Sequence, residues 1–220
     1  MGLKHRINNY ALHQRSKLYR NPRNTGFDEK NTRCEKMSEK ITSPETEEEI
    51  RKKIISVLLG SANKPINSKI NFQKELFLVT QSFPKFGSLF NFIPHKFGPY
   101  SNSAEFIIEN YPEFFDSGKP GVKLTPDGES FYQSVLEQMH PENRSTLEKI
   151  IKNIRSLYDN LNDNEFMFLI YKTYGYTQKS DVFDKLMNKR KRLASGLLNK
   201  GIITHQRYEE LIVEDNEVTA

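Results

Sequence analysis

The chain has 220 residues, of which 36% are hydrophobic, and a mean hydropathy of −0.70. This length suits one domain with a sizeable core or two small ones, and the low hydropathy predicts that part of the chain lies outside that core. No apolar run approaches the roughly 18 residues that span a bilayer, and the N-terminus lacks a signal-peptide pattern. The single cysteine, Cys34, excludes an internal disulfide and any multi-cysteine zinc site. We therefore expect a soluble, cytoplasmic protein without a membrane partner.

The net charge of +5 is concentrated at one end of the chain. Residues 1–23 hold six Lys and Arg and no acid, so the remaining residues sum to −1. Residues 1–42 show no helical or strand period, which predicts a disordered basic tail, and residues 213–220 are expected to be disordered too. The tail could bind nucleic acid, could be solvated without a partner, or could be an upstream extension with Met37 as the natural start. In the last case most of the electrostatic argument for nucleic acid disappears.

The elements expected between residues 43 and 212 form a single domain. Ser43 and Pro44 predict the N-cap and first position of a helix that Gly60 ends. A second helix is expected over 69–82, followed by a short strand over 89–93, which Pro94 restricts to a sheet edge. The next segments in order are a turn at Gly98-Pro99, a helix capped by Ser101 or Ser103 to about Tyr111, and a hairpin of 114–115 with 122–124.

The C-terminal half is predicted to be helical. Thr125 caps one helix, and apolar residues over 147–161 fall on one face of another. Further helices are expected from an Asp163 cap to Gly175, from a Ser180 cap to Lys200, and from Thr204 onward. The expected fold is therefore mainly α with a small β element, a compact helical domain with a winged-helix-like β-hairpin.

Arg190 lies near the middle of an apolar stripe on the helix expected over 181–200. Because an unpaired buried charge costs several kcal/mol, its guanidinium needs a carboxylate or several carbonyls. Arg190 is either a structural residue that fixes the helix or a residue that lines a partner groove. Its neighbours Lys189, Lys191 and Arg192 are either a solvated face or a nucleic-acid contact.

Catalytic patterns are not evident in the chain. The histidines lack the spacing of a helical metal pair, and there is no phosphate-binding Gly loop or Gly-x-Ser-x-Gly elbow. His95, the one histidine in a dense motif, is interpreted as a packing residue. We expect no enzyme activity, no cofactor, no metal site and no small-molecule substrate.

The segment Phe97-Gly98-Pro99-Tyr100-Ser101 is the densest motif. It is either a turn with aromatic side chains packed beneath it, or a surface on which Phe97 and Tyr100 anchor a protein partner.

Three segments resemble the Panacea domain family, also described as SocA-like or phage-associated antitoxin-like proteins, with the related YwgA-like proteins. They are Lys69-Ile-Asn-Phe-Gln73-Lys74-Glu-Leu76-Phe77, the aromatic segment leading into Phe97-Gly98-Pro99-Tyr100-Ser101, and Ile170-Tyr171-Lys-Thr-Tyr174 followed by Lys179-Ser180. The resemblance covers roughly residues 50–200. It implies a mainly helical domain that binds other proteins, commonly neutralising a toxin or delivering it to a protease. The motif positions carried over are Gln73, Lys74, Gly98, Pro99, Tyr100 and Ser180, and the family offers no catalytic residue.

A second hypothesis comes from the segment Val122-Lys-Leu124-Thr125-Pro-Asp-Gly128. It looks like the junction between wing and helix in winged-helix regulators, which makes a DNA-binding regulator the alternative. The near-neutral charge of residues 24–220 disfavours this alternative, because phosphate neutralisation drives non-specific affinity.

Overall fold

The computed structural model describes residues 45–62, 64–177 and 180–213. The chain divides into two units, Met1–Glu45 and Thr46–Ala220, and only the second is described below. Several predicted features lie outside the described residues. They are the tail over 1–42, the alternative start at Met37, the residues Ser43 and Pro44, and the C-terminal end after Val213.

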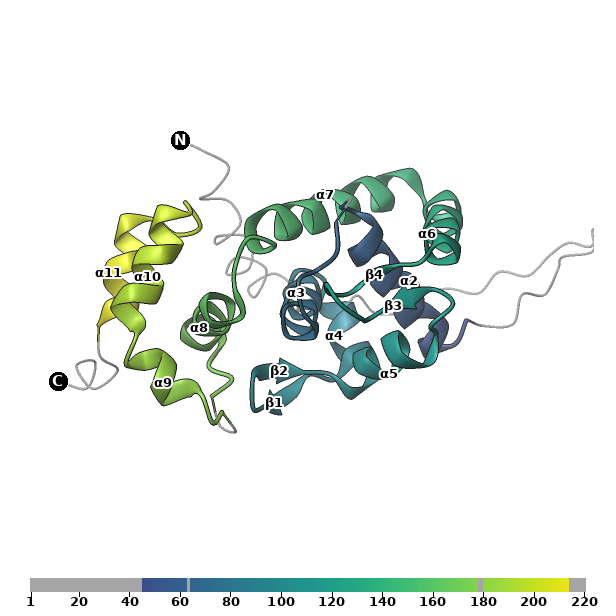
Figure 1. Ribbon diagram of the computed structural model, residues 1–220. Helices are drawn as coiled ribbons and strands as arrows, with labels where there is room; N and C mark the ends of the chain where they lie inside the picture. Colours follow the sequence, from purple (N-terminus) through teal and green to yellow (C-terminus); the bar gives the residue numbers. More distant parts are fainter. Residues whose placement is uncertain (1–44, 63, 178–179, 214–220) are drawn as a thin grey trace, which may run out of the picture. The chain divides into compact units, whose positions relative to one another are not determined.

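The described residues form ten helices and two antiparallel hairpins, which confirms a mainly α fold with a small β element (Figure 1). The helices are α2 (Glu47–Gly60), α3 (Lys69–Ser82), α4 (Pro84–Phe90), α5 (Asn102–Asn110), α6 (Pro126–Gln138), α7 (Pro141–Tyr158), α8 (Asp163–Tyr174), α9 (Phe183–Met187), α10 (Arg190–Asn199) and α11 (His205–Ile212). The strands are β1 (Ile93–His95), β2 (Gly98–Tyr100), β3 (Phe115–Asp116) and β4 (Lys123–Leu124).

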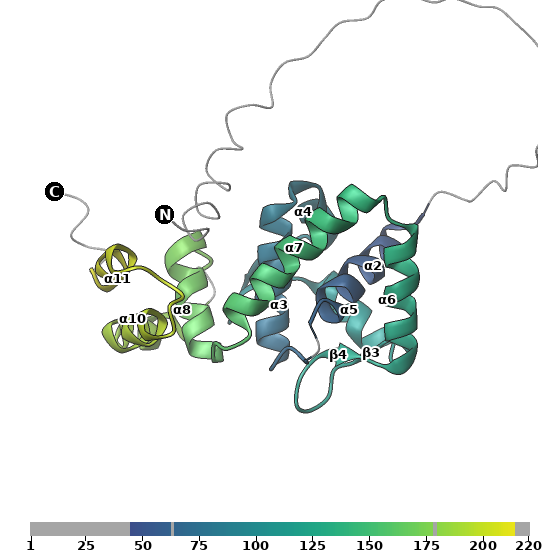
Figure 2. The ribbon, with the colours of Figure 1, turned by 90° about the horizontal axis from the view of Figure 1, so that it is seen from above.

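Helix α3 lies at the centre of this arrangement. Ten consecutive residues, 71–80, are buried, so the helix has no solvent face over nearly three turns. Figure 2 shows α3 and α7 between α8 on one side and α2, α5 and α6 on the other. Because α3 also carries polar residues, each of them must find a partner inside the core.

A buried ionic cluster joins α3 to α7. Arg155 on α7 is 1% exposed, and its Nε lies 2.8 Å from Asp159 Oδ1 and 3.3 Å from Glu75 Oε2 of α3. Its Nη atoms donate to the carbonyls of Leu58 and Lys64 at 3.0 and 2.7 Å. Burial raises the pKa of Glu75 well above its ordinary value, although Arg155 opposes that shift. The cluster fixes the end of α2 and the middle of α3 against α7.

Several predicted helix boundaries are correct, and others in the first half of the chain need correction. The N-cap of α2 is Thr46, three residues after Ser43, and its hydroxyl accepts the amide of Glu49. Pro84 ends α3 as expected, yet it also starts α4, because proline is tolerated in a first helical turn. Leu89 and Phe90 therefore lie in a helix, and the strand expected over 89–93 begins only at Ile93.

The Gly98-Pro99 pair is part of a strand and not of a turn. The turn is Lys96-Phe97, and Pro94 of β1 lies opposite Pro99 of β2. The other hairpin, β3–β4, has the expected position, and Thr125 caps α6 with its hydroxyl on the amide of Gly128. The expected cap Asp163 is the first residue of α8, and Asn162 forms its capping box.

The single helix expected over 181–200 is broken into α9 and α10. Arg190 Nη1 donates to Met187 O at 3.2 Å, a carbonyl that would accept the amide of Lys191 in a continuous helix. Arg190 Nε also donates to Ile212 O at 2.9 Å, at the end of α11. The guanidinium therefore uses several carbonyls, one of the two solutions that the sequence left open. It joins α9, α10 and α11, where the sequence predicted two helices.

Within the three described ranges, no helix is both long and apolar enough to cross a membrane.

Candidate functional site

Gln73 of α3 forms two hydrogen bonds with Ser101, the residue that joins β2 to α5. Its Nε2 donates to Ser101 O at 3.1 Å, and its Oε1 accepts the amide of Ser101 at 2.9 Å. Ser101 in turn caps α5 through the amide of Ala104 and donates its hydroxyl to Phe90 O. Gln73 is only 5% exposed, so it satisfies buried backbone groups that would otherwise be costly.

Lys74, the next residue, holds strand β2 itself. Its Nζ donates to Pro99 O at 3.0 Å, and the side chain is 2% exposed. Burial lowers the pKa of Lys74 to about 7, against the opposing effect of Asp163. The two motif residues Gln73 and Lys74 therefore lie beneath the hairpin and position it.

The third motif segment, on α8, also holds the hairpin. We refer to the contacts of Gln73, Lys74 and Tyr171 with the hairpin as the clamp. Gly98 has a φ of +89°, and a Cβ at this position would lie 3.2 Å from Tyr171 Cε1. The Tyr171 hydroxyl lies 3.2 Å from Lys96 O and 2.8 Å from Ser180 Oγ. The three sequence segments that carry the family resemblance thus meet at one place in the fold.

The hairpin presents its other face outward. Ile93 lies opposite Tyr100, and His95 stacks on the Tyr100 ring with centroids 4.6 Å apart. Ile93 is 43% exposed, and His95 is exposed as well. Pro94 and Pro99 have no backbone N–H, so a further strand could not pair with the hairpin at these positions. A partner that binds here would therefore contact side chains.

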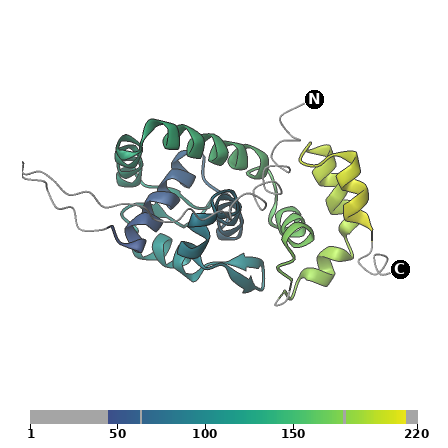
Figure 3. The same ribbon diagram turned by 180° about the vertical axis from the view of Figure 1, so that it is seen from behind.

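Helix α5 is linked to this face through Tyr100. The Tyr100 hydroxyl donates a hydrogen bond to the Glu105 carboxylate, and partial burial together with this hydrogen bond raises the pKa of Tyr100 to about 12. Phe106, the next residue, is 48% exposed, whereas Ile107 and Ile108 are buried. Figures 1 and 3 show the β1–β2 hairpin beside α5 along one edge of the described unit. We refer to Ile93, His95, Tyr100, Glu105, Phe106 and Glu109 as the hairpin–α5 face.

The remaining predicted site residues lie elsewhere or are half-buried. Phe97 is half-buried at the hairpin turn, with Lys96 Nζ 5.7 Å from its ring centroid. Ser180 is half-buried against Tyr171. Lys189, Lys191 and Arg192 are exposed around the start of α10, apart from the motif segments. Arg190 is half-buried and bonded to carbonyls, as described above.

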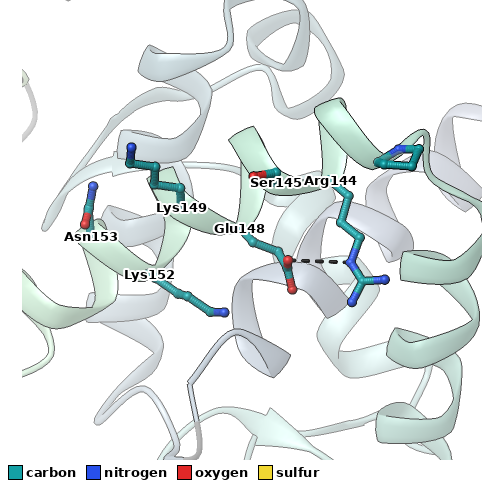
Figure 4. A pocket seen from close by; sticks show the side chains of 7 residues that line it. Arg144, Ser145, Glu148, Lys149, Lys152 and Asn153 are labelled. Atoms are coloured by element: carbon teal, nitrogen blue, oxygen red, sulfur yellow. Dashed lines mark ion pairs between the residues drawn. The ribbon is translucent and has the colours of Figure 1, made fainter.

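Two hollows open on the surface, and their charges differ. One, of about 500 Å³, lies along α7 and presents Arg144, Lys149 and Lys152 with Glu148 (Figure 4). In it, Arg144 forms an ion pair with Glu148 at 3.5 Å. The other, of about 480 Å³, lies at the C-terminal end of α5 and includes Lys69, Glu109 and Asp116.

Histidines, cysteines and carboxylates do not gather in groups of three or more that could hold a metal ion, as far as the described residues go. No protein-family model matches this chain, and no curated protein matches it.

Sequence reasoning did not identify Ile93, Glu105, Phe106 or Glu109 as functional candidates. The exposure of Phe106 could have been inferred from its position on α5, because Ala104, Ile107 and Ile108 define the buried side of that helix. The contact between Tyr100 and Glu105 depends on the path of β2 into α5, which no local pattern specified.

Proposed function

We propose that this protein is a non-enzymatic protein-interaction module of antitoxin or adaptor type, which neutralises or delivers a protein partner. The observation that carries the proposal is the clamped hairpin. Buried polar bonds from Gln73 and Lys74 hold a rigid backbone beneath the exposed Ile93 and Phe106. A preformed surface of this kind binds with little loss of conformational entropy.

The composition of the hairpin–α5 face supports protein recognition. Exposed apolar side chains and a stacked aromatic pair are the groups that anchor protein interfaces. The resemblance to antitoxin-like domains points to the same class of function, and the quoted motif segments meet beneath this face.

The test is isolation of the tagged full-length chain from the cells that produce it naturally. We expect a protein to co-purify with the unchanged chain and to be reduced at least tenfold by Ile93→Asp. Val213→Asp is the matched control, because Val213 is 40% exposed at the end of α11. Equal recovery of the partner with both variants would show that binding uses another surface, and recovery of nucleic acid alone would favour the DNA-binding alternative.

The DNA-binding alternative has one supporting observation, the exposed cations Lys189, Lys191 and Arg192 on α10. In a winged-helix regulator the helix before the wing reads DNA, and here that helix is α5. It carries Glu105 and Glu109 and no Lys or Arg, which disfavours contact with phosphates. Duplex binding that weakens steeply with salt and persists in a chain starting at Met37 would support the alternative.

A further inference from the structure

A buried pair of carboxyl groups lies where α3 contacts α7. The side chains of Glu75 and Asp159 are 0% and 3% exposed, and their carboxyl groups lie within hydrogen-bonding reach of each other. Two ionised carboxylates cannot form this hydrogen bond, because each of them only accepts. The contact therefore needs a proton on one of the two groups.

The nearby guanidinium does not take the place of this proton. Arg155 Nε donates to Asp159 Oδ1 at 2.8 Å, and the Nη atoms donate to backbone carbonyls of α2 and of the loop that follows it. Arg155 Nε lies 3.3 Å from Glu75 Oε2, yet neither Glu75 oxygen accepts a hydrogen bond from any described residue. One buried cation thus faces two buried carboxyl groups and is hydrogen-bonded to only one of them.

The charged groups that act on Glu75 are Arg155 and Asp159 of α7 and Lys64 of the loop between α2 and α3. Lys64 Nζ lies 3.3 Å from Asp159 Oδ2, but the lysine side chain is 50% exposed, so water screens its charge. Burial is the main cause that raises the pKa of Glu75. Arg155 and Lys64 oppose this shift, while Asp159 adds to it through its charge and the hydrogen bond. This environment favours the protonated form of Glu75.

We propose that Glu75 and Asp159 share one proton in the folded protein, and that this proton acts as a pH-sensitive lock between α3 and α7. When the proton leaves at high pH, two buried carboxylates repel each other beside a single buried guanidinium, and the contact between the helices weakens. Glu75 directly follows Gln73 and Lys74, so the lock holds the helix that carries the clamp. The inference goes beyond the proposed function, because the lock needs no partner.

Infrared spectroscopy of the full-length chain tests for the proton directly. At pH 6 we expect the C=O stretch of a protonated carboxylic acid, and we expect Glu75→Gln to lose it. Glu137→Gln is the matched control and should keep the band, since Glu137 is exposed on α6. In Asp159→Asn, Arg155 Nε is free to bond to Glu75, which should then ionise, so the band should disappear there as well.

Unfolding equilibria at several pH values measure the lock itself. The unfolded chain releases this proton above about pH 5, whereas the folded chain keeps it, so rising pH favours unfolding. The unfolding equilibrium constant of the unchanged chain, divided by that of Glu75→Gln, should rise about tenfold per pH unit from pH 5 until the pair loses its proton. The ratio cancels the contributions of groups that titrate in both proteins.

Two kinds of result would overturn the proposal. Absence of the infrared band from the unchanged chain, or a ratio that stays constant with pH, would show that Glu75 is ionised and that no lock exists. A band that persists in Asp159→Asn would show that burial alone keeps Glu75 protonated and that the proton is not shared. The band of the unchanged chain needs no variant, so it decides the first point even if a variant fails to fold.

Discussion

The β1–β2 hairpin and the helices α9–α11 are attached to the fold in different ways. The hairpin is held from below by Gln73 and Lys74 of the fully buried helix α3, and from the side by Tyr171 of α8. Helices α9 and α10 pack on α8 and bury apolar side chains such as Ala194 and Leu197, while the polar contacts of this region, such as Lys200–Glu165 and Arg207–Thr173, are more exposed. The motif residues Gln73 and Lys74 therefore position the exposed hairpin although they are buried themselves.

This difference bears on how the two regions can bind. A backbone held by buried hydrogen bonds keeps its shape whether or not a partner is present, because breaking those bonds leaves unsatisfied polar groups. Contacts between exposed charges give way more easily. The hairpin region is thus suited to a defined protein partner.

The largest expected effect comes from the buried ionic cluster between α3 and α7. Arg155→Met should lower the free energy of unfolding by about 3–5 kcal/mol, because it removes the buried donor of Asp159 and of the carbonyls of Leu58 and Lys64. Glu75→Gln is the matched control. Burial raises the pKa of Glu75, so a neutral amide imitates its protonated form, and the expected loss is below about 1 kcal/mol. Chemical denaturation measures both, and equal losses would mean that Glu75 is ionised.

A smaller effect is expected at the point where the hairpin meets α8. Gly98→Ala should cost about 2–3 kcal/mol, since it adds strain at a positive φ and places a Cβ against Tyr171. Gly175→Ala has a similar strain at a φ of +69° but no atom within 4 Å of its Cβ. It should cost only about 1 kcal/mol. Thermal or chemical unfolding of the two variants separates the packing contribution from the backbone strain.

The buried lysine makes stability depend on pH. Because folding lowers the pKa of Lys74 from 10.5 to about 7, the unfolded chain binds more protons between these values. The free energy of unfolding should therefore rise with pH in this window, by about 2 kcal/mol between pH 7 and pH 9 from this group alone. Asp163 is the charged group that acts on Lys74 most strongly.

Lys74→Met isolates that contribution, since other titrating groups remain in both proteins. The difference in unfolding free energy between the unchanged chain and the variant should grow in favour of the unchanged chain from pH 7 to pH 9. A constant difference over this range would mean that Lys74 titrates normally in the folded protein.

Arg190 gives the smallest expected effect. Arg190→Met removes hydrogen bonds to Met187 O and Ile212 O in a half-buried position, for a loss of about 1 kcal/mol. We expect no change in partner binding, because Arg190 is not part of the hairpin–α5 face. A binding defect without a loss of stability would instead place Arg190 in a partner groove, the functional role considered from the sequence.

The sequence predicted best where local signals act alone. The cap residues Thr125 and Thr204 and the end of α8 at Gly175 were placed correctly, because an N-cap side chain or a left-handed glycine needs no distant partner. The break between α9 and α10 was not predicted, since Arg190 bonds there to the end of α11, a contact with a distant segment that no local pattern specifies.

The candidate site was predicted in part for the same reason. The dense motif drew attention to Gly98, Pro99 and Tyr100, but its contacts with Gln73, Lys74 and Tyr171 arise only when three distant segments meet. Ile93 and Phe106 of the hairpin–α5 face were not predicted to be exposed, because apolar residues in a sequence are usually assigned to the core.

The most direct test of the clamp is native-state hydrogen exchange at the amide of Ser101, which donates to Gln73 Oε1. We expect this amide to exchange only through global unfolding, while the amides of α10 exchange through an opening of lower free energy. Exchange of Ser101 faster than that of α10 would contradict the account, because the hairpin would then be a mobile loop and not a preformed binding surface.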